Sequence, residues 1–434
     1  MSNVSEWEET TLGAEADLLT GFPFKSERYT DSADSIPLVR GDNIVQGAMR
    51  WDGVKRWPLS ERGEHELYEL REGDVVLAMD RPWIEAGLKY AAISKHDLPC
   101  LLVQRTARLR GGPKLDIGFL RYLIGSLEFT QHIHAITTGT AVPHISGRQI
   151  KDFAFTLPPL AEQKAIAAVL GALDDKIELN RRMNATLEAM ARALFQSWFV
   201  DFDPVRANLD GRPPAALDPA TAALFSDSFD ETELGHIPHG WIAGHFGKII
   251  AAERERIGES DAVVLSAVAS SQLVRSDEHF NKQVYSKSIS NYLKVRRWDF
   301  AYNPSRINIG SIGMLKESVI GAVSPVYEVF RPKSSYHWFV ERSLAQPDTK
   351  VWIQTLCSGS VRQSLKLRDL ESIPLVVPPP PIVQAFNKTW EQWHDLIQAN
   401  ERESRTLATL RDTLLPKLLS GELSVAEVEK EVPV

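Results

Sequence analysis

The chain has 434 residues, of which 43% are hydrophobic, and a formal net charge of −8, which is typical of a globular protein of two to four domains. Its apolar runs are short and interrupted by prolines, and its first ten residues carry three glutamates, so the sequence predicts neither a membrane span nor a secretory signal. Two cysteines cannot build a disulfide framework or a four-cysteine zinc site, and we expect a cytoplasmic protein.

The first 157 residues are expected to form a mixed α/β domain. Strand-like apolar runs at 74–79 and 101–109 are separated by segments rich in Gly, Pro and Asn, a pattern typical of short strands joined by turns.

A long helix is predicted at residues 158–200. A Pro-Pro pair ends the strand-like run before it, and apolar residues then recur at alternating steps of four and three, which is the a/d period of a coiled coil. The expected seam consists of Ile166, Leu170, Leu173, Ile177, Asn180, Leu187 and Leu194.

Residues 201–233 are rich in proline and acidic side chains, and we expect them to be a linker. A second mixed α/β domain is predicted at 234–378, with strand-like runs at 262–269, 298–302 and 326–330. Residues 241–378 hold 18 basic and 13 acidic side chains, an excess that fits either a nucleic-acid partner or ordinary scatter. A second helix is predicted at 379–423, followed by a tail at 424–434.

The chain contains an internal repeat with an offset of 220 residues. The segment 138–140 (TGT) recurs as 358–360 (SGS), and 153–159 (FAFTLPP) recurs as 373–379 (IPLVVPP). The same offset carries the helical seam to Phe386, Trp390, Trp393, Ile397, Asn400, Leu407 and Leu414. A fainter match relates 71–82 to 295–306, and in both copies a later strand ends in a basic residue near Gly or Pro. The repeat predicts two halves of the same architecture.

The two helices are expected to pair with each other. A run of about 30 residues gives a rod of about 45 Å, which is too long for one small core, so its apolar stripe needs a partner. The repeat supplies that partner, and we predict an antiparallel intramolecular coiled coil in which Asn180 and Asn400 fix register. The alternative is two separate amphipathic helices that each cover their own domain.

Motifs for catalysis and cofactor binding are missing. The sequence contains no G-x-x-x-x-G-K-[ST] loop and no G-x-G-x-x-G motif, and the segment 303–306 (NPSR) lacks the aromatic residue that stacks on a flipped base. His132, His134 and His144 have no Cys or carboxylate at metal-ligand spacing, so we interpret them as part of a polar loop. We expect no metal, no cofactor and no catalytic residue.

At the two helices the chain resembles the specificity subunit of type I restriction-modification enzymes. The resemblance is strongest over 157–205, and it is also characteristic at 410–423 (LRDTLLPKLLSGEL), at 233–241 (ELGHIPHGW) and at the TGT and SGS loops. It covers the order of nearly the whole chain and is loose within the two α/β domains.

The resemblance implies two target-recognition domains held apart by two antiparallel spacer helices, with an internal pseudo-twofold repeat. It also implies a non-catalytic subunit that binds a bipartite sequence in double-stranded DNA, one half-site per domain. Such a subunit docks two modification subunits, which methylate adenine, and through them restriction subunits. Two alternatives stay open: a fused restriction or modification enzyme, and a coiled-coil adaptor that binds protein rather than DNA.

Candidate DNA contacts are polar and basic residues in loops, because Arg pairs with guanine, Asn or Gln pairs with adenine, and cations contact phosphates. In the first domain they are Asn43, Gln46, Arg50, Lys55, Arg56, Arg81, Thr138, Thr140 and His144. In the second they are Arg275, Asn281, Lys282, Lys287, Asn291, Arg296, Arg297, Asn303, Arg306, Arg362 and Lys366.

The helices carry more apolar residues than a two-helix seam needs, among them Ala167, Val169, Met190, Phe195, Trp198 and Phe199. Large apolar surfaces seldom stay exposed. We expect these residues to meet another subunit, or residues 195–200 to lie under the adjacent recognition domain.

Overall fold

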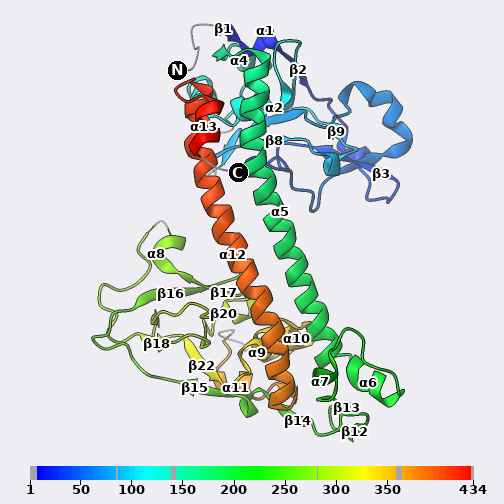
Figure 1. Cartoon of the computed structure of the whole chain (residues 1–434), viewed down its shortest axis with the longest axis vertical. Helices are drawn as coiled ribbons and strands as arrows, with labels where there is room; N and C mark the ends of the chain where they lie inside the picture. The colour runs from blue at the N-terminus through cyan, green and yellow to red at the C-terminus, as the bar shows by residue number, and fades with distance from the viewer. Residues whose placement is uncertain (1–6, 85–86, 138–142, 281, 358–363, 432–434) are drawn as a thin grey trace. The chain divides into compact units, whose positions relative to one another are not determined.

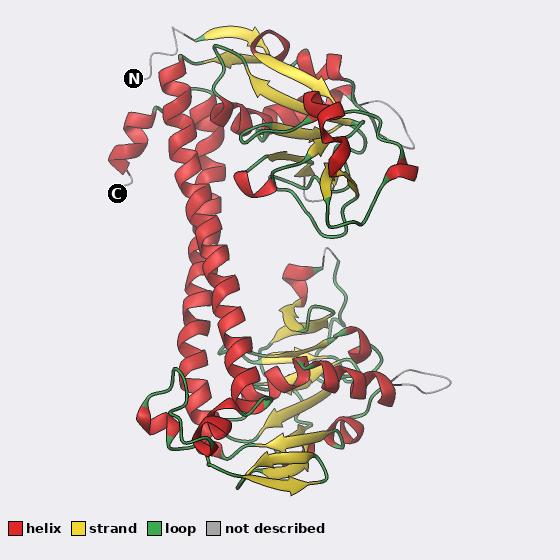
Figure 2. Cartoon of the chain, turned by 90° about the vertical axis from the view of Figure 1, so that its right-hand side faces the viewer, coloured by secondary structure: helices red, strands yellow, loops and turns green. Residues whose placement is uncertain are grey.

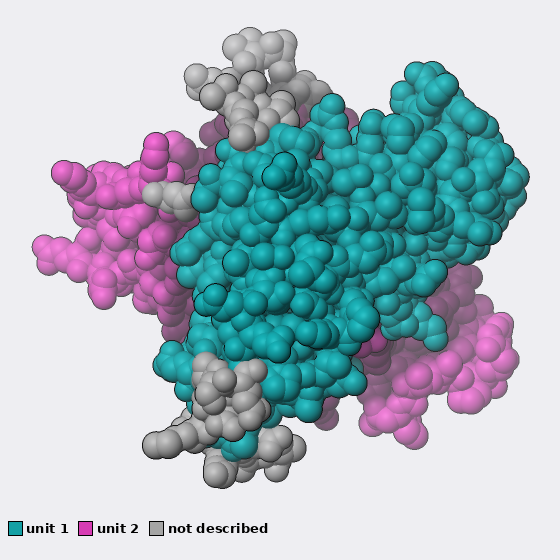
Figure 3. All heavy atoms as spheres, turned by 90° about the horizontal axis from the view of Figure 1, so that it is seen from above, with its two compact units in different colours: residues 1–181, 400–434 teal, residues 182–399 magenta. Residues whose placement is uncertain are grey.

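The computed structural model describes residues 7–84, 87–137, 143–280, 282–357 and 364–431. The chain forms two compact units: unit 1 contains residues 1–181 and 400–434, and unit 2 contains residues 182–399 (Figure 3). Two helices of 40 residues, α5 (Leu160–Phe199) and α12 (Pro380–Leu419), each contribute one half to each unit. Unit 1 is therefore completed by a segment from the far end of the chain.

Unit 1 is a mixed α/β structure (Figure 1). Its main sheet has the order β2-β10-β5-β8, with every neighbouring pair antiparallel. A smaller sheet has the order β4-β3-β9, and β1 pairs with β11. The elements are β1 (Glu8–Thr11), α1 (Leu12–Glu15), β2 (Ala16–Thr20), β3 (Ser35–Val39), β4 (Arg56–Pro58), β5 (Val75–Ala78), β6 (Trp83–Ile84), β7 (Gly87–Leu88), β8 (Tyr90–Ala92), β9 (Leu101–Leu102), β10 (Thr106–Gly111), α2 (Ile117–Ile124), α3 (Leu127–Ile136), α4 (Gly147–Lys151), β11 (Ala154–Leu157) and α13 (Val425–Glu431).

Unit 2 has the same kind of structure, and in both units strands lie beside the long helices (Figure 2). Its sheets have the orders β15-β22-β19-β20 and β17-β16-β21-β18, with pairs β14-β23 and β12-β13. The elements are α6 (Asp203–Leu209), α7 (Pro219–Ala222), β12 (Phe229–Thr232), β13 (Gly235–Pro238), β14 (Ile242–His245), β15 (Ile250–Glu253), β16 (Val263–Val268), β17 (Gln272–Arg275), α8 (Ser276–His279), β18 (Leu293–Val295), β19 (Phe300–Tyr302), β20 (Ile312–Met314), β21 (Gly321–Val323), β22 (Glu328–Pro332), α9 (His337–Ala345), α10 (Pro347–Leu356), α11 (Leu367–Glu371) and β23 (Pro374–Val377).

The internal repeat is confirmed element by element. Helices α2, α3, α4 and α5 and strand β11 begin 220 residues before α9, α10, α11, α12 and β23, respectively. The sheet β2-β10-β5-β8 corresponds in order to β15-β22-β19-β20. The prediction of a mixed α/β fold with two long helices is therefore correct.

The two long helices contact each other within each unit. In unit 1, Asn180 Nδ2 donates a hydrogen bond to Glu403 at 2.8 Å, and Ile166 and Leu170 of α5 lie in one apolar core with Leu414 of α12. In unit 2, the Phe195 and Phe386 rings lie 5.9 Å apart. In each unit the long helices also pack on strands and short helices. The predicted pairing of the helices and the alternative, in which each helix covers a domain, therefore both describe part of the packing.

Residues 201–233, expected as a linker, contain α6, α7 and β12. Phe202, Val205 and Phe225 from this segment are buried in the core of unit 2. Three apolar side chains are enough to bind a proline-rich, acidic segment to the core, because each one buries a large area.

None of the helices within the described ranges combines the length and apolar character that a membrane crossing needs.

Phe386 should be one of the residues on which unit 2 depends most. It has no exposed surface and contacts the rings of Phe195, Trp198 and Phe199. We expect Phe386→Ala to lower the free energy of unfolding by about 3–5 kcal/mol, because it leaves a cavity. Leu396→Ala on the same helix is the control, since Leu396 is 42% exposed, and it should change stability by less than about 0.5 kcal/mol. Urea unfolding followed by tryptophan fluorescence measures both, and equal effects would contradict this packing.

Candidate nucleic-acid interface

The candidate residues of the first domain divide into structural and exposed groups. Asn43 is buried: its Oδ1 accepts from the Arg40 backbone N–H at 2.7 Å, and its Nδ2 donates to the Leu38 carbonyl at 3.1 Å. Arg56 donates to the Ser35 hydroxyl and carbonyl at 2.7 and 2.8 Å. Asn43 and Arg56 thus hold their own loop and strand together, and their polar atoms are used in doing so.

The remaining described candidates of this domain lie at the surface. Gln46, Lys55 and Arg81 are exposed, and Arg50 is exposed while donating to the Asp42 carbonyl at 2.9 Å. Thr138 and Thr140 lie outside the described residues.

Asp80 connects two segments that are far apart in the sequence. It accepts hydrogen bonds from Arg105 and His144, and Arg81 N–H donates to the Pro143 carbonyl at 2.7 Å. Burial raises the pKa of Asp80, but the hydrogen bonds from Arg105 and His144 outweigh it and hold that pKa below its usual value. The arrangement brings the predicted candidates Arg81 and His144 together. Arg105, which is 67% exposed, joins them and was missed because nothing in its sequence neighbourhood distinguishes it.

Several candidates of the second domain already have protein partners. Arg275 forms an ion pair with Glu317 at 3.0 Å, and Arg296 shares Glu255 with Lys294. Asn303 accepts from the Ser305 backbone N–H at 3.1 Å, which stabilises a turn. These contacts leave fewer polar atoms for another molecule.

The other candidates of this domain are more accessible. Lys282, Lys287, Arg306 and Lys366 are exposed. Arg297 is also exposed and lies over the Trp298 ring at 4.3 Å, and Asn291 is exposed and accepts from Arg256 at 3.0 Å. Asn281 and Arg362 lie outside the described residues.

Both units contain the same ion pair between a buried aspartate and a partly exposed arginine. Asp74 accepts two hydrogen bonds from Arg110, both at 2.7 Å, and Asp299 accepts two from Arg331 at 2.7 and 2.8 Å. Each carboxylate also accepts a hydrogen bond at 2.8 Å from the backbone N–H of the residue three positions earlier, which is Arg71 for Asp74 and Arg296 for Asp299. The faint match between 71–82 and 295–306 therefore reflects a shared device: a bidentate pair that fixes a turn to the end of a strand.

The predicted seam residues are all buried or partly buried, and some of them contact other elements, as Trp390 contacts Trp338 of α9. Ile166, Leu170, Ile177, Leu414 and Asn400 are buried, as are Phe386, Trp390 and Ile397, whereas Leu173, Leu187, Leu194, Trp393 and Leu407 are partly buried. Asn180 is fully buried, and no partner is found for its Oδ1 within the described part of the chain.

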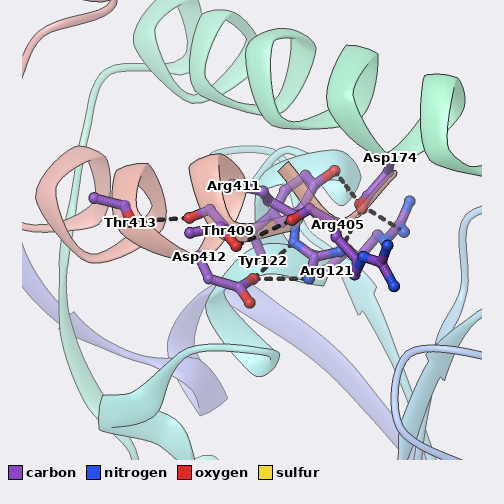
Figure 4. Close-up of polar contacts among 8 residues, drawn as sticks. All are labelled: Arg121, Tyr122, Asp174, Arg405, Thr409, Arg411, Asp412 and Thr413. Carbon is purple, nitrogen blue, oxygen red and sulfur yellow. Dashed lines mark hydrogen bonds and ion pairs between the residues drawn. The ribbon is translucent and has the colours of Figure 1, made fainter. Parts of the chain in front are cut away.

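A polar cluster joins both long helices to the first domain in unit 1 (Figure 4). Asp174 on α5 accepts from Arg121 at 2.9 Å, from the Tyr122 hydroxyl at 2.8 Å and from Arg411 on α12 at 2.7 Å. Burial lowers the pKa of Arg411, but the bonds to Asp174 and Asp412 outweigh it and raise that pKa above its ordinary value. Arg411 stays charged, so one carboxylate connects three elements of unit 1.

The surplus apolar residues of the helices have two outcomes. Phe195, Trp198 and Phe199 are buried in the core of unit 2, under the second domain, whereas Met190 is 45% exposed. Ala167 and Val169 are partly buried.

The histidines have local partners. His132 Nε2 lies 2.9 Å from the Gln149 carbonyl, and His134 packs on Trp83 at 4.2 Å. Across the ranges that the structure describes, no group of three or more His, Cys, Asp or Glu side chains is placed to hold a metal ion.

Comparison with known proteins gives concordant matches. Residues 5–189 match the family model of the type I restriction modification DNA specificity domain. The chain is 39% identical over 170 residues to the type I restriction enzyme EcoAI specificity subunit of Escherichia coli, a match that spans 38% of this chain and 28% of that protein. It is 27% identical over 422 residues to the MjaIX specificity subunit of Methanocaldococcus jannaschii, spanning 94% of this chain and 88% of that one.

The fold is also that of a solved structure. The type I restriction-modification S subunit from M. genitalium is 15% identical, with a TM-score of 0.57, over 95% of this chain and 96% of that one.

Substitution should lower the stability of the protein at Asn43 but hardly change it at Gln46. Asn43→Ala should lower the free energy of unfolding by about 1–3 kcal/mol, since the Arg40 N–H and the Leu38 carbonyl lose their partner. Gln46→Ala should change stability by less than about 0.5 kcal/mol. Thermal unfolding of the two variants checks this, and a stable Asn43→Ala protein would show that the side chain is free for another role.

We expect the protein to be less stable with Asn180 than with an apolar residue at this seam position. We expect Asn180→Leu to raise the free energy of unfolding by about 1 kcal/mol, because a buried amide oxygen without a partner is replaced by an apolar side chain. Asn180→Asp should lower it, because a buried carboxylate would then face Glu403. Denaturation midpoints of both variants give the test, and a loss of stability in Asn180→Leu would contradict it.

Proposed function

The chain belongs to the family of type I restriction enzyme specificity subunits, and on this premise we propose that it binds a bipartite sequence in double-stranded DNA. Each of the two recognition domains, 1–157 and 234–378, reads one half-site. The chain performs no reaction itself and directs the modification and restriction subunits of a type I complex, in the cytoplasm, to their target.

The observation that supports this proposal most directly is the repeat of one framework with different surfaces. The sheet order, the helices at an offset of 220 residues and the Asp-Arg pair are shared by the two units. The exposed polar residues differ between them, for example Gln46 and Lys55 in one and Lys282 and Lys287 in the other. Two copies of a scaffold that carry different polar loops are suited to reading two different short sequences.

The long helices supply a means of fixing the gap between half-sites. A helix of 40 residues is about 60 Å long, and successive major-groove faces of DNA recur about every 34 Å. We infer that helix length, rather than any base contact, sets the number of unread base pairs.

Contacts with the bases and phosphates of DNA are assigned by this proposal to candidates whose side chains are exposed. In the first domain these are Gln46, Lys55, Arg81 and His144, and in the second Lys282, Lys287, Arg297, Arg306 and Lys366. The undescribed loops that contain Thr138, Thr140, Asn281 and Arg362 belong to the same proposal. Asn43, Arg56 and Asn303 support loops and turns instead.

Partner subunits are assigned to the outer faces of the long helices. Leu179, Met190 and Leu396 are between 42% and 45% exposed there, although leucine and methionine are usually buried. We infer that two modification subunits cover these faces and that restriction subunits join through them.

The function can be tested with the purified full chain, alone and with a modification subunit. We expect DNA binding that weakens steeply with salt, and methyl transfer only when the modification subunit is present. Methyl transfer by the chain alone would instead indicate a fused enzyme. Absence of salt-dependent DNA binding in both states would indicate a protein-binding adaptor.

Exchange of one recognition domain should change one half of the target. Replacing residues 1–156 with the corresponding segment of a related subunit should alter one half-site and leave the other half-site and the gap unchanged, because each domain reads alone. A map of methylated adenines in the host genome provides the readout. A change in both halves would contradict the assignment of one half-site per domain.

A further inference from the structure

Unit 2 contains a polar cavity of about 700 Å³ between the turn at Arg297, the start of α9 and the first half of α12. Its volume lies in the range of small-ligand sites, about 300–1,000 Å³. Its lining includes Arg297, Trp298, Lys333, His337, Asn387 and Lys388, together with the carboxylates Glu391 and Asp395.

The corresponding place in unit 1 has quite different side chains. Trp298 corresponds to Gly73, since each precedes the buried aspartate of the ion pair and each has a positive φ, 73° and 87°. Their neighbours correspond as well. Trp298 stacks on His337 with the ring centroids 4.4 Å apart, and a Cβ atom at Gly73 would lie 3.3 Å from Ile117, which is the residue 220 positions before His337. A glycine is therefore sufficient for the fold at this position, and the tryptophan side chain is not required by it.

A tryptophan with a positive φ has a strained backbone. Strain of this kind is found mainly at functional sites, where the side chain binds a ligand or takes part in a reaction. The other positions around the cavity changed as well. On α12, Asn387 and Lys388 stand where α5 has Ala167 and Ala168, and Arg297 stands where unit 1 has Glu72. Five apolar, small or acidic positions of unit 1 thus carry polar, aromatic or cationic residues in unit 2.

A buried polar atom in the cavity wall, Asn387 Oδ1, lacks a hydrogen-bond partner among the described residues. Asn387 is 6% exposed; its Nδ2 donates to the Ser335 carbonyl at 2.6 Å, which orients the amide, but its Oδ1 accepts nothing. His337 Nε2 is also buried and makes no hydrogen bond among the described residues, but it lies 3.6 Å from Glu391 Oε1. Burial lowers the pKa of His337 to about 4, so the ring is neutral near pH 7. Buried polar atoms are nearly always paired, so the Asn387 oxygen indicates an absent ligand that donates a hydrogen bond.

Three cations line the same space, and in the described part of the chain none of them forms a hydrogen bond or ion pair with the lining carboxylates Glu391 and Asp395. Lys333 and Lys388 are exposed, and within the described ranges neither has an ion pair, while Arg297 is held by the Trp298 ring and by the Lys316 carbonyl at 3.1 Å. Convergent cations favour a group with several anionic oxygens.

We propose that this cavity binds a phosphate ester, with the phosphate on Arg297, Lys333 and Lys388 and the neighbouring sugar or base on Asn387 and His337. Two sources share this chemistry: a free nucleotide and the backbone of bound DNA. Only the second rests on the proposed function, so the two can be tested separately.

The test compares the full-length Lys333→Gln/Lys388→Gln double variant with a Lys248→Gln/Lys350→Gln control. Lys248 and Lys350 are exposed lysines of the same unit that do not line the cavity, and both variants remove two charges. Calorimetry with ADP, and with inorganic phosphate, is the first arm. We expect ADP to bind the unaltered chain and the control alike, and the cavity variant about tenfold or more weakly.

The second arm measures affinity for a DNA duplex across a salt series. If ADP does not bind but duplex affinity falls in the cavity variant beyond the control, with a shallower salt dependence, the phosphate belongs to the DNA backbone and the site stands. Equal ADP affinity in the two variants, or no ADP binding together with equal duplex affinity, would overturn the proposal. A chain that binds ADP but no DNA would refute the proposed function and leave this site intact.

Discussion

The packing of α5 against α12 is the interaction on which both compact units depend. Each helix is apolar along a stripe that no single recognition domain could cover over 40 residues. In unit 1 the stripe is covered by Leu12, Phe119 and the far end of α12, and in unit 2 by the aromatic side chains around Phe386. Because the second half of α12 belongs to unit 1, that unit is built from two segments, residues 1–181 and 400–434, whereas unit 2 is the continuous segment 182–399. The C-terminal part of the chain is therefore as necessary to unit 1 as the N-terminal part.

Fixed polar contacts supplement this apolar packing. Asp174 connects α2, α5 and α12 in unit 1, and Arg342 on α9 connects to Glu188 on α5 at 3.1 Å in unit 2. The Asp-Arg pair of each unit acts similarly within the sheets. A buried ion pair contributes little net stability but is costly to break on one side. Such pairs suit a protein that must present loops in fixed positions.

Much of the fold could be predicted from the sequence, because it is periodic. The heptad seam and the 220-residue offset located both long helices and their correspondence. The recognition surfaces were harder to predict: the sequence suggested Asn43 and Gln46 equally, although the first is inside a loop and the second faces solvent. A polar side chain looks the same in sequence whether the backbone folds around it or away from it. The strained Trp298 was likewise invisible, since a positive φ at a tryptophan has no sequence signal.

The two long helices, α5 and α12, are both 40 residues long and correspond in the repeat. The central claim is that this helix pair sets the distance between two independently read half-sites. The most direct measurement removes one heptad from the middle of both helices at equivalent positions and maps the methylated sequence in a host that supplies the modification subunits. The account predicts the same two half-sites with an altered gap. An unchanged gap, or altered half-site bases at the original gap, would contradict it.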